Sequence, residues 1–311
     1  MMSTSIRKIA VIGTGAIGAS WTTLFLSRGL EVVATDIAPD AESKLRQFVQ
    51  QAWPAMEALG LGPEVDRGRL RFTPDLREAL DGVDLVQENG PERLDFKLSL
   101  YETMDAALPP SVPIVSSSSG LMMSDIQVGC KRHPERCVIG HPFNPPHLIP
   151  LVEIVGGKLT SEQTIQQVTE FFRDLGKRTV RLHKEVPGHV ANRLASALFR
   201  EIVHLVSEGV VSVEDADTAV CWGPGLRWGV MGPSLLYHLG GGAGGIEHFF
   251  DQFTGPMQAW WKVLGNPTIT PEIRQQMIAG VKAEAHGRTL EQLAAQRDAT
   301  LLALLKSRAG E

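Results

Sequence analysis

The chain has 311 residues, of which 43% are hydrophobic and 21% charged, and its net charge is −5. This length and composition are typical of a globular protein with a large core and about two domains. The negative charge, without a basic stripe, argues against nucleic acid as a partner. No apolar run approaches the roughly 18 residues that cross a membrane.

The three cysteines, Cys130, Cys137 and Cys221, form no C-x-x-C pair. Their odd number and spacing argue against a disulfide framework and against a zinc site, so no metal is expected. The N-terminal residues lead into the first predicted strand almost at once, which leaves no room for a signal peptide or transit segment. We therefore expect a cytoplasmic protein.

The first forty residues follow the order strand, glycine turn, helix, strand, acid. Residues 9–12 and 31–35 predict buried strands, residues 19–27 predict an amphipathic helix, and the turn between has the pattern Gly-x-Gly-x-x-Gly. In such a unit the glycines permit a tight turn and close approach of a pyrophosphate, and the helix start attracts its charge. The acid at the end of the second strand can bind both ribose hydroxyls and repels a 2′-phosphate, which favours NAD over NADP. The alternative is an ordinary glycine turn that binds no nucleotide. The expected NAD contacts here are Gly13, Thr14, Gly15, Ala16, Ile17, Gly18 and Asp36.

Strand and helix patterns alternate as far as residue 182. This alternation predicts a mostly parallel, Rossmann-type α/β sheet with helices on both faces. After Val186-Pro187-Gly188 the strand pattern stops, and the rest of the chain is expected to be helical. We therefore predict a nucleotide-binding domain over residues 1–187 and an all-helical C-terminal domain over residues 188–311. The remaining strands are predicted at 70–72, 83–88, 112–115, 137–140, 151–155 and 179–182.

Polar residues gather where the predicted strands end, and open α/β sheets bind their ligands at this edge. A run of four serines ends one strand, and His141 ends another. Histidine can take a hydroxyl proton near neutral pH, and a carboxylate on its other nitrogen would fix the tautomer. Glu153 lies in an apolar run that could return it beside this imidazole. His141 alone could be structural, but a buried acid needs a partner, and a pair would satisfy both residues.

Five ordered motifs together resemble the 3-hydroxyacyl-CoA dehydrogenase superfamily, and the resemblance covers nearly the whole chain. They are Gly13-x-Gly15-x-x-Gly18, the run Ser116–Gly120, His141-Pro-Phe-Asn144-Pro, Leu151-Val-Glu153-Ile-Val and Pro187-Gly188-x-x-x-Asn192-Arg193.

The resemblance implies NAD-dependent oxidation of an L-3-hydroxy group, with His141 as the proton acceptor and Glu153 as its partner. It implies that Ser119 and Asn192 hold the substrate oxygen. Gly120 stands where acyl-CoA members usually carry another serine, so Ser118 stays an alternative to Ser119. Further cofactor contacts implied by the match are Glu92, Lys97 and Asn144.

Several stretches are most similar to the carnitine 3-dehydrogenase branch, among them Gly225–Trp228 and Tyr237–Gly241. This similarity implies L-carnitine as the substrate, and the family suggests a homodimer. Aromatic residues are concentrated between positions 222 and 261. Aromatic faces bind trimethylammonium groups and an arginine can pair with a carboxylate, although such rings more often form a core or an interface. The candidate substrate residues are Phe143, Arg227 and Trp228.

Three other functions stay open at this point. L-gulonate 3-dehydrogenase shares the core motifs. A 3-hydroxyacyl-CoA substrate such as 3-hydroxybutyryl-CoA would need cations for its phosphate, which Arg67, Arg69 and Arg71 could supply. The third is a nucleotide-binding structural protein of the λ-crystallin type, against which the intact His141 and Glu153 argue.

Overall fold

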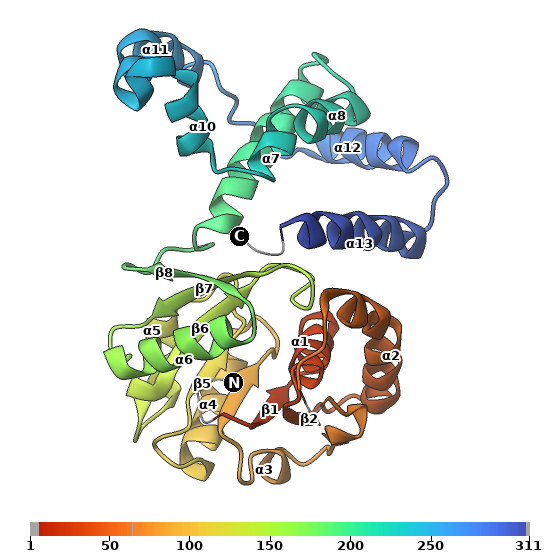
Figure 1. Cartoon of the computed structure of the whole chain (residues 1–311), viewed down its shortest axis with the longest axis vertical. Helices are drawn as coiled ribbons and strands as arrows, with labels where there is room; N and C mark the ends of the chain where they lie inside the picture. Colours follow the sequence, from red (N-terminus) through yellow and green to blue (C-terminus); the bar gives the residue numbers. More distant parts are fainter. Residues whose placement is uncertain (1–5, 64, 309–311) are drawn as a thin grey trace. The chain divides into compact units, whose positions relative to one another are not determined.

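The computed structural model describes residues 6–63 and 65–308, which form two compact units (Figure 1). The first unit contains the described residues up to Asn192 together with those from Gln296 onwards, and the second spans Arg193–Ala295. The predicted boundary after residue 187 lies a few residues before this division. The sequence pattern does not predict that the last helix, α13 (Leu290–Ser307), returns to the first unit, where Leu301, Leu302 and Leu305 pack on the core.

The first unit contains an eight-stranded sheet in the order β3-β2-β1-β4-β5-β6-β7-β8. The six strands from β3 to β6 are parallel, and their order is that of a doubly wound dinucleotide-binding sheet. β7 is antiparallel to β6, and β8 is parallel to β7. The predicted mostly parallel Rossmann-type sheet is therefore confirmed. The strands are β1 (Lys8–Ile12), β2 (Glu31–Thr35), β3 (Leu70–Phe72), β4 (Leu85–Glu88), β5 (Ile114–Ser116), β6 (Cys137–Pro142), β7 (Leu151–Gly156) and β8 (Arg178–Leu182).

Helices cover both faces of this sheet because successive strand residues point to opposite sides. On β1, Ile9 and Val11 belong to the core beneath α1, α2 and α6, whereas Ala10 and Ile12 belong to the core beneath α4. Both cores are dominated by aliphatic side chains, so the sheet is a rigid base for residues at its carboxyl edge. The helices of this unit are α1 (Ala16–Ser27), α2 (Ala41–Leu59), α3 (Leu76–Ala79), α4 (Leu94–Ala107), α5 (Met123–Ile126) and α6 (Glu162–Asp174).

Helix α1 differs from the prediction in two respects. It begins at Ala16, directly after Gly15, rather than at residue 19. It is also buried along most of its length and is not amphipathic, because α2 and α6 both pack against it. Trp21 stacks on Phe25 at a ring distance of 5.4 Å and contacts Phe172 of α6 at 5.3 Å.

The regular elements of the second unit, Arg193–Ala295, are all helices joined by loops, as predicted. A small core of Ile202, Val206, Val213 and Ala216 joins α7 to α8, with Met277 of α12 packed against it. Helices α10 and α11 pack on each other (Figure 1). The helices are α7 (Ala191–Ser207), α8 (Val213–Trp222), α9 (Pro224–Trp228), α10 (Pro233–Gly240), α11 (Gly245–Trp261) and α12 (Pro271–Glu284).

Candidate active site

The glycine turn between β1 and α1 is closely packed on one side and open on the other. Gly13 has a φ of +81°, and a Cβ atom there would lie 2.7 Å from the carbonyl oxygen of Asn89. A Cβ atom at Gly18 would lie 1.9 Å from the carbonyl oxygen of Gly13. At Gly15, by contrast, a Cβ atom would meet nothing within 4 Å. The turn therefore excludes side chains where the backbone packs and leaves space in front of the helix.

That space fits the pyrophosphate of a dinucleotide. Gly15 precedes α1 without any side-chain cap from the described residues, and the first turn of the helix carries no acid. Its N–H groups and the helix dipole therefore favour an anion. The residues that would hold the pyrophosphate are those predicted from the motif, Gly13 to Gly18.

Asp36 follows β2 and is tied to the same turn. Its Oδ2 accepts hydrogen bonds from the Thr14 N–H at 2.7 Å and from the Thr14 hydroxyl at 3.1 Å, and Oδ1 accepts from the Ala38 N–H at 3.0 Å. Burial raises the pKa of Asp36, but these hydrogen bonds outweigh burial and hold the pKa below its usual value. The side chain is therefore a carboxylate at neutral pH, which suits ribose hydroxyls and opposes a 2′-phosphate.

His141 and Glu153 are direct cross-strand partners in the antiparallel pair of β6 and β7. The Nδ1 atom of His141 lies 2.9 Å from Oε2 of Glu153, and both side chains are buried. Oε1 of Glu153 accepts hydrogen bonds from the N–H groups of Val190 at 2.8 Å and Ala191 at 3.0 Å. Burial raises the pKa of Glu153, but the bonds from His141, Ala191 and Val190 lower it further than burial raises it. Because the resulting carboxylate only accepts, Nδ1 carries the hydrogen and Nε2 of His141 is free to take a proton.

His141 faces a hollow of about 320 Å³ in the first unit. This hollow joins the first turn of α1 to the carboxyl end of β6, so the expected dinucleotide site and the imidazole share one space. The structure therefore brings together His141, Ser119, Asn192, Phe143 and Asn144, which the sequence predicted for different roles. The lining residues are Ile17, Ser117, Ser119, His141, Pro142, Phe143, Asn144 and Asn192.

The geometry distinguishes the serines of the run. Ser118 is buried, and its hydroxyl donates to Glu92 at 2.7 Å, whereas Ser119 lines the hollow. Ser117 also lines it, although the sequence did not single it out. Its hydroxyl is engaged with Gln87, Trp21 and Asn89, so it is held as part of the wall. Ser119 is thus the serine that is placed to meet a ligand.

Glu92 and Lys97 bind the segments next to this hollow. Oε1 of Glu92 accepts from the N–H groups of Ser119, Gly120 and Leu121 at 2.7–3.1 Å. The ammonium of Lys97 is 1% exposed and donates to both carboxylate oxygens of Glu88 at 2.7 and 2.8 Å. These contacts fix the serine loop and the end of β4; contact of Glu92 or Lys97 with the cofactor stays a prediction.

His189 is the residue of this site that sequence reasoning missed. Its ring centroid lies 4.9 Å from that of His141, and its Nε2 lies 3.0 Å from the carbonyl oxygen of Ser118. The motif that begins at Pro187 leaves this position unspecified, and no periodicity marks it. The only available signal was the residue type itself, because a histidine between Gly188 and Val190 is a group that can carry a proton.

Arg227 and Trp228 line a second hollow, of about 270 Å³, within the second unit. Aromatic rings form part of its wall: Tyr237 stacks on Phe249 at 4.7 Å, and Phe249 stacks on Phe253 at 5.0 Å. Arg227 and Trp228, two of the candidate substrate residues, therefore lie beside aromatic rings in this unit. Whether the substrate binds there stays a prediction.

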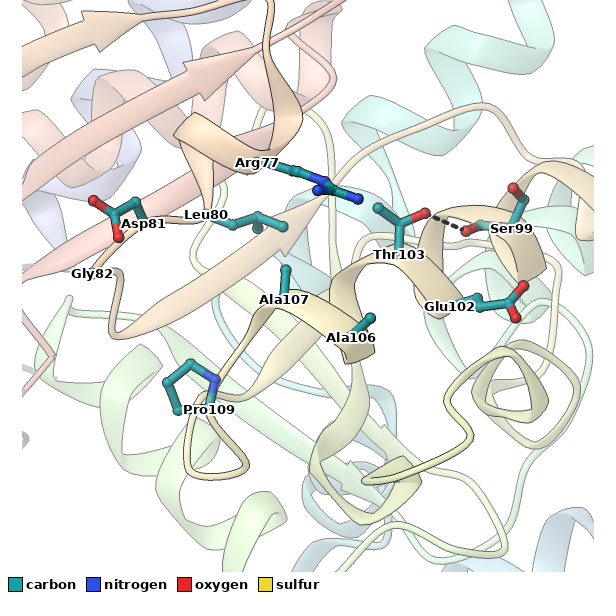
Figure 2. A pocket seen from close by; sticks show the side chains of 10 residues that line it. All are labelled: Arg77, Leu80, Asp81, Gly82, Ser99, Glu102, Thr103, Ala106, Ala107 and Pro109. Atoms are coloured by element: carbon teal, nitrogen blue, oxygen red, sulfur yellow. Dashed lines mark hydrogen bonds between the residues drawn. The ribbon is translucent and has the colours of Figure 1, made fainter.

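Two further hollows among the described residues of the first unit lie at the opposite edge of the sheet from His141. The one in Figure 2, of about 710 Å³, is bounded by Gly82 and Pro109, which precede β4 and β5. Asp81 and Glu102 lie at opposite ends of it, so no group of charges converges there (Figure 2). Arg69 and Arg71 line a third hollow near the start of β2 and β3.

Residues 6–63 and 65–308 contain neither a membrane-spanning helix nor a metal-binding group of side chains. No helix in this part of the chain combines the length and apolar character needed to cross a bilayer. Within the same residues, no three His, Cys, Asp or Glu side chains are grouped so that they could hold a metal ion.

Comparison with known proteins agrees with this geometry. Residues 8–186 match the model of the NAD-binding domain of 3-hydroxyacyl-CoA dehydrogenase, and residues 188–276 match the model of its C-terminal domain. The chain is 45% identical over 303 residues to an L-carnitine dehydrogenase of Nocardiopsis dassonvillei, an alignment that covers 97% of this chain and 92% of the relative. It is 43% identical over 304 residues to an L-carnitine dehydrogenase of Pseudomonas putida, with coverage of 98% and 94%.

A solved structure is similar over the same extent. It is that of 5-formyl-3-hydroxy-2-methylpyridine 4-carboxylic acid 5-dehydrogenase, an NAD-dependent dismutase, with a TM-score of 0.85 and 34% identity. The match covers 98% of this chain and 99% of that one. The family expected from the five motifs is confirmed: the chain belongs to the 3-hydroxyacyl-CoA dehydrogenase family, as an NAD-dependent oxidoreductase with an α/β nucleotide-binding part and a helical C-terminal part.

Proposed function

We propose that the chain oxidises L-carnitine at its C3 hydroxyl to 3-dehydrocarnitine, with NAD as the acceptor. The observation that carries the chemistry is the buried His141–Glu153 pair at the wall of a hollow that reaches the start of α1. The choice of substrate is supported by the relatives named L-carnitine dehydrogenase, which align with nearly the whole chain.

The proton is handled by His141. Its Nδ1–H donates to Glu153, so the unprotonated Nε2 can accept the hydroxyl proton of the substrate. The Glu153 carboxylate then stabilises the imidazolium, and the Val190 and Ala191 amides hold that carboxylate in place. NAD, when bound, supplies the acceptor for the two electrons released from the carbinol carbon.

Ser119 and Asn192 are the proposed holders of the substrate oxygen. Both line the hollow with His141, and a hydroxyl and an amide can each hydrogen-bond an alcohol and the ketone it becomes. Asn144 lines the same hollow, which also reaches α1, and this fits a contact with the cofactor. Phe143 supplies an apolar wall beside them.

Two observations bear on the choice among substrates. Arg69 and Arg71 lie at the amino ends of the strands, the opposite edge of the sheet from His141, and Arg67 packs over Trp53 at 5.3 Å. These cations are therefore poorly placed to hold a CoA phosphate while His141 acts on the acyl chain. Arg227 and Trp228 remain candidates for the carboxylate and the trimethylammonium group of L-carnitine.

We also propose a cytoplasmic homodimer. Large apolar side chains of the second unit are exposed, including Trp222 at 78% and Trp261 at 65%, which is more than a typical monomer leaves in water. Sedimentation equilibrium measures the mass directly. Free thiols at Cys130 and Cys137, with sulfur atoms 3.3 Å apart, fit a reducing compartment.

The test of function is NADH formation by the purified protein with L-carnitine, L-gulonate and 3-hydroxybutyryl-CoA in parallel. The proposal predicts the highest kcat/KM with L-carnitine. Activity with the CoA ester alone would contradict it. NAD binding of full affinity without turnover of any hydroxy acid would support the structural, λ-crystallin-like alternative instead.

A further inference from the structure

His189 lies against the proposed base without being part of the proton path described above. It is 3% exposed, and its ring is tilted by 52° to that of His141 at a centroid distance of 4.9 Å. The residue just before it is Gly188, and the amides just after it, Val190 and Ala191, hold Glu153. One short segment therefore touches both members of the catalytic pair.

The hydrogen bonding of His189 defines its tautomer. The carbonyl oxygen of Ser118 can only accept, so Nε2 of His189 carries the hydrogen and donates it at 3.0 Å. Its Nδ1 is buried and has no hydrogen-bond partner among the described residues. A cationic ring would bury a second N–H donor without an acceptor, so the neutral form is the one that this environment accommodates.

The charged groups around His189 agree with a neutral ring. Burial is the main cause that lowers the pKa of His189, and the nearby His141 on β6 lowers it further. The Ser118 carbonyl, Glu153 on β7 and Glu92 before α4 act in the opposite direction but do not reverse the shift. A neutral neighbour matters here because a second cation beside His141 would oppose formation of its imidazolium.

The backbone of His189 is held in an unfavourable conformation. Its φ is +50°, in the left-handed region that residues other than glycine rarely adopt. An unpaired buried nitrogen and a left-handed backbone both reduce stability, and such features are concentrated at functional sites. A wholly structural residue at this position would be expected to avoid both.

The bond to Ser118 acts directly on the neighbouring serine. The carbonyl of Ser118 and the N–H of Ser119 belong to one planar peptide unit. His189 holds the oxygen of this unit, while Glu92 accepts from its N–H at 3.0 Å. The orientation of Ser119 in the hollow is thus set from both sides.

We propose that His189 is a positioning residue for the reaction: its Nε2–H holds the Ser118–Ser119 peptide while its uncharged ring packs on His141, so that the serine and the base keep one relative geometry. This role rests on the proposed function, because it presumes that Ser119 contacts the substrate oxygen. His189 acts through Ser119 and takes no proton from the substrate.

The test is a double-mutant cycle that combines His189→Phe with Ser119→Ala. Phenylalanine keeps a ring of similar size but removes the donor, so kcat should fall at least about tenfold, since small misplacements of a reacting group are costly. In the Ser119→Ala background the same His189→Phe change should alter kcat less than about twofold, because the group it positions is already gone.

A conservative variant separates positioning from packing. The side-chain amide of His189→Gln reaches about as far as the imidazole Nε2 and can donate to the Ser118 carbonyl. It should therefore restore most of the kcat that His189→Phe loses. Thermal unfolding midpoints and NADH dissociation constants of all variants show whether a loss of kcat merely follows a loss of folded protein or of cofactor binding.

Each outcome decides the proposal. Non-additive effects on kcat together with rescue by glutamine support it. Additive effects, equal losses with phenylalanine and glutamine, or a wild-type kcat in His189→Phe overturn it. A wild-type protein that does not oxidise L-carnitine overturns the proposed function and this inference with it, whereas an active wild type with additive variants overturns the role of His189 alone.

Discussion

The hollow beside His141 and the hollow beside Arg227 are built in different ways. The first has hydroxyl, amide and imidazole groups on its wall, and its imidazole lies at the end of a strand and is hydrogen-bonded to the buried carboxylate of Glu153. The second has one guanidinium among aromatic and aliphatic side chains carried by three helices. The first suits proton transfer, which needs fixed geometry, and the second suits recognition of a charged, partly apolar molecule.

The difference indicates how such a protein can change its substrate while it keeps its reaction. The backbone register of β6 and β7 sets the pair of His141 and Glu153, so this geometry tolerates little change. The aromatic walls depend on side-chain packing alone, and other side chains could replace them without moving the proton acceptor. If the hollow beside His141 carries proton transfer and the hollow beside Arg227 carries substrate recognition, variants of the first should change mainly kcat and variants of the second mainly KM.

The largest effect is expected from Glu153→Gln in the first unit. An amide can donate to Nδ1 of His141, which would move the ring hydrogen to Nε2 and block proton acceptance. We expect kcat to fall at least about 10²-fold, with an unchanged dissociation constant for NADH. Glu170→Gln on the exposed face of α6 is the matched control. A kcat within about threefold of wild type for Glu153→Gln would remove the carboxylate from the mechanism.

The next effect contrasts two glycines that precede helices, Gly15 before α1 and Gly232 before α10. A Cβ atom would meet nothing within 4 Å at either position, so neither alanine variant should be strained. Gly15→Ala places a methyl group where the pyrophosphate is expected and should weaken NAD binding at least about tenfold. Gly232→Ala should leave it unchanged. Titration of protein fluorescence with NADH measures the affinity of both variants. Equal affinities would contradict the assignment of the glycine turn, Gly13 to Gly18, to the pyrophosphate.

A smaller effect, on KM, is expected from Arg227→Gln in the second unit. Loss of a charge-assisted pair with the carboxylate of L-carnitine should raise KM about fivefold and lower kcat much less. Arg274→Gln on α12 serves as the control for a lost positive charge. If Arg227→Gln lowered kcat as strongly as Glu153→Gln does, the claim that the second hollow binds the substrate without taking part in proton transfer would be wrong.

The last expected effect, and the smallest on catalysis, concerns stability and belongs to the first unit alone. Burial lowers the pKa of His147 to about 4, so between pH 6.5 and 4 the unfolded chain binds a proton that the folded chain does not. Stability should therefore fall as the pH drops through this window, by on the order of 3 kcal/mol from this residue. His147→Asn should flatten this dependence of the unfolding midpoint. At pH 8 His147 is neutral in both the folded and the unfolded chain. The difference in unfolding midpoint between wild type and His147→Asn at this pH therefore measures the lost contact with Ser20 alone.

The parts of the molecule that depend on local pattern could be predicted from the sequence. Buried strands, the glycine turn and the pairing of His141 with Glu153 each follow from periodicity, from a short motif or from the need of a buried acid for a partner. The antiparallel direction of β7 is consistent with the return of Glu153 but is not marked by any residue.

The features that escaped prediction depend on contacts between distant segments. His189 contacts Ser118, from which it is 71 positions away in the chain, and no pattern near either residue predicts this contact. Lys97 forms an ion pair with the buried Glu88, whereas the family match had suggested only a cofactor contact. The end of α13 packs on the first unit, but the leucines of a helix do not show by themselves which core they cover.

The central claim is that the imidazole at position 141 accepts the proton of the substrate hydroxyl. The most direct measurement is the single-turnover rate of NADH formation from L-carnitine by wild type and His141→Ala, both saturated with NAD. The account predicts unchanged NAD affinity and a rate at least about 10²-fold lower in the variant. A variant that forms NADH at nearly the wild-type rate would show that another group accepts the proton.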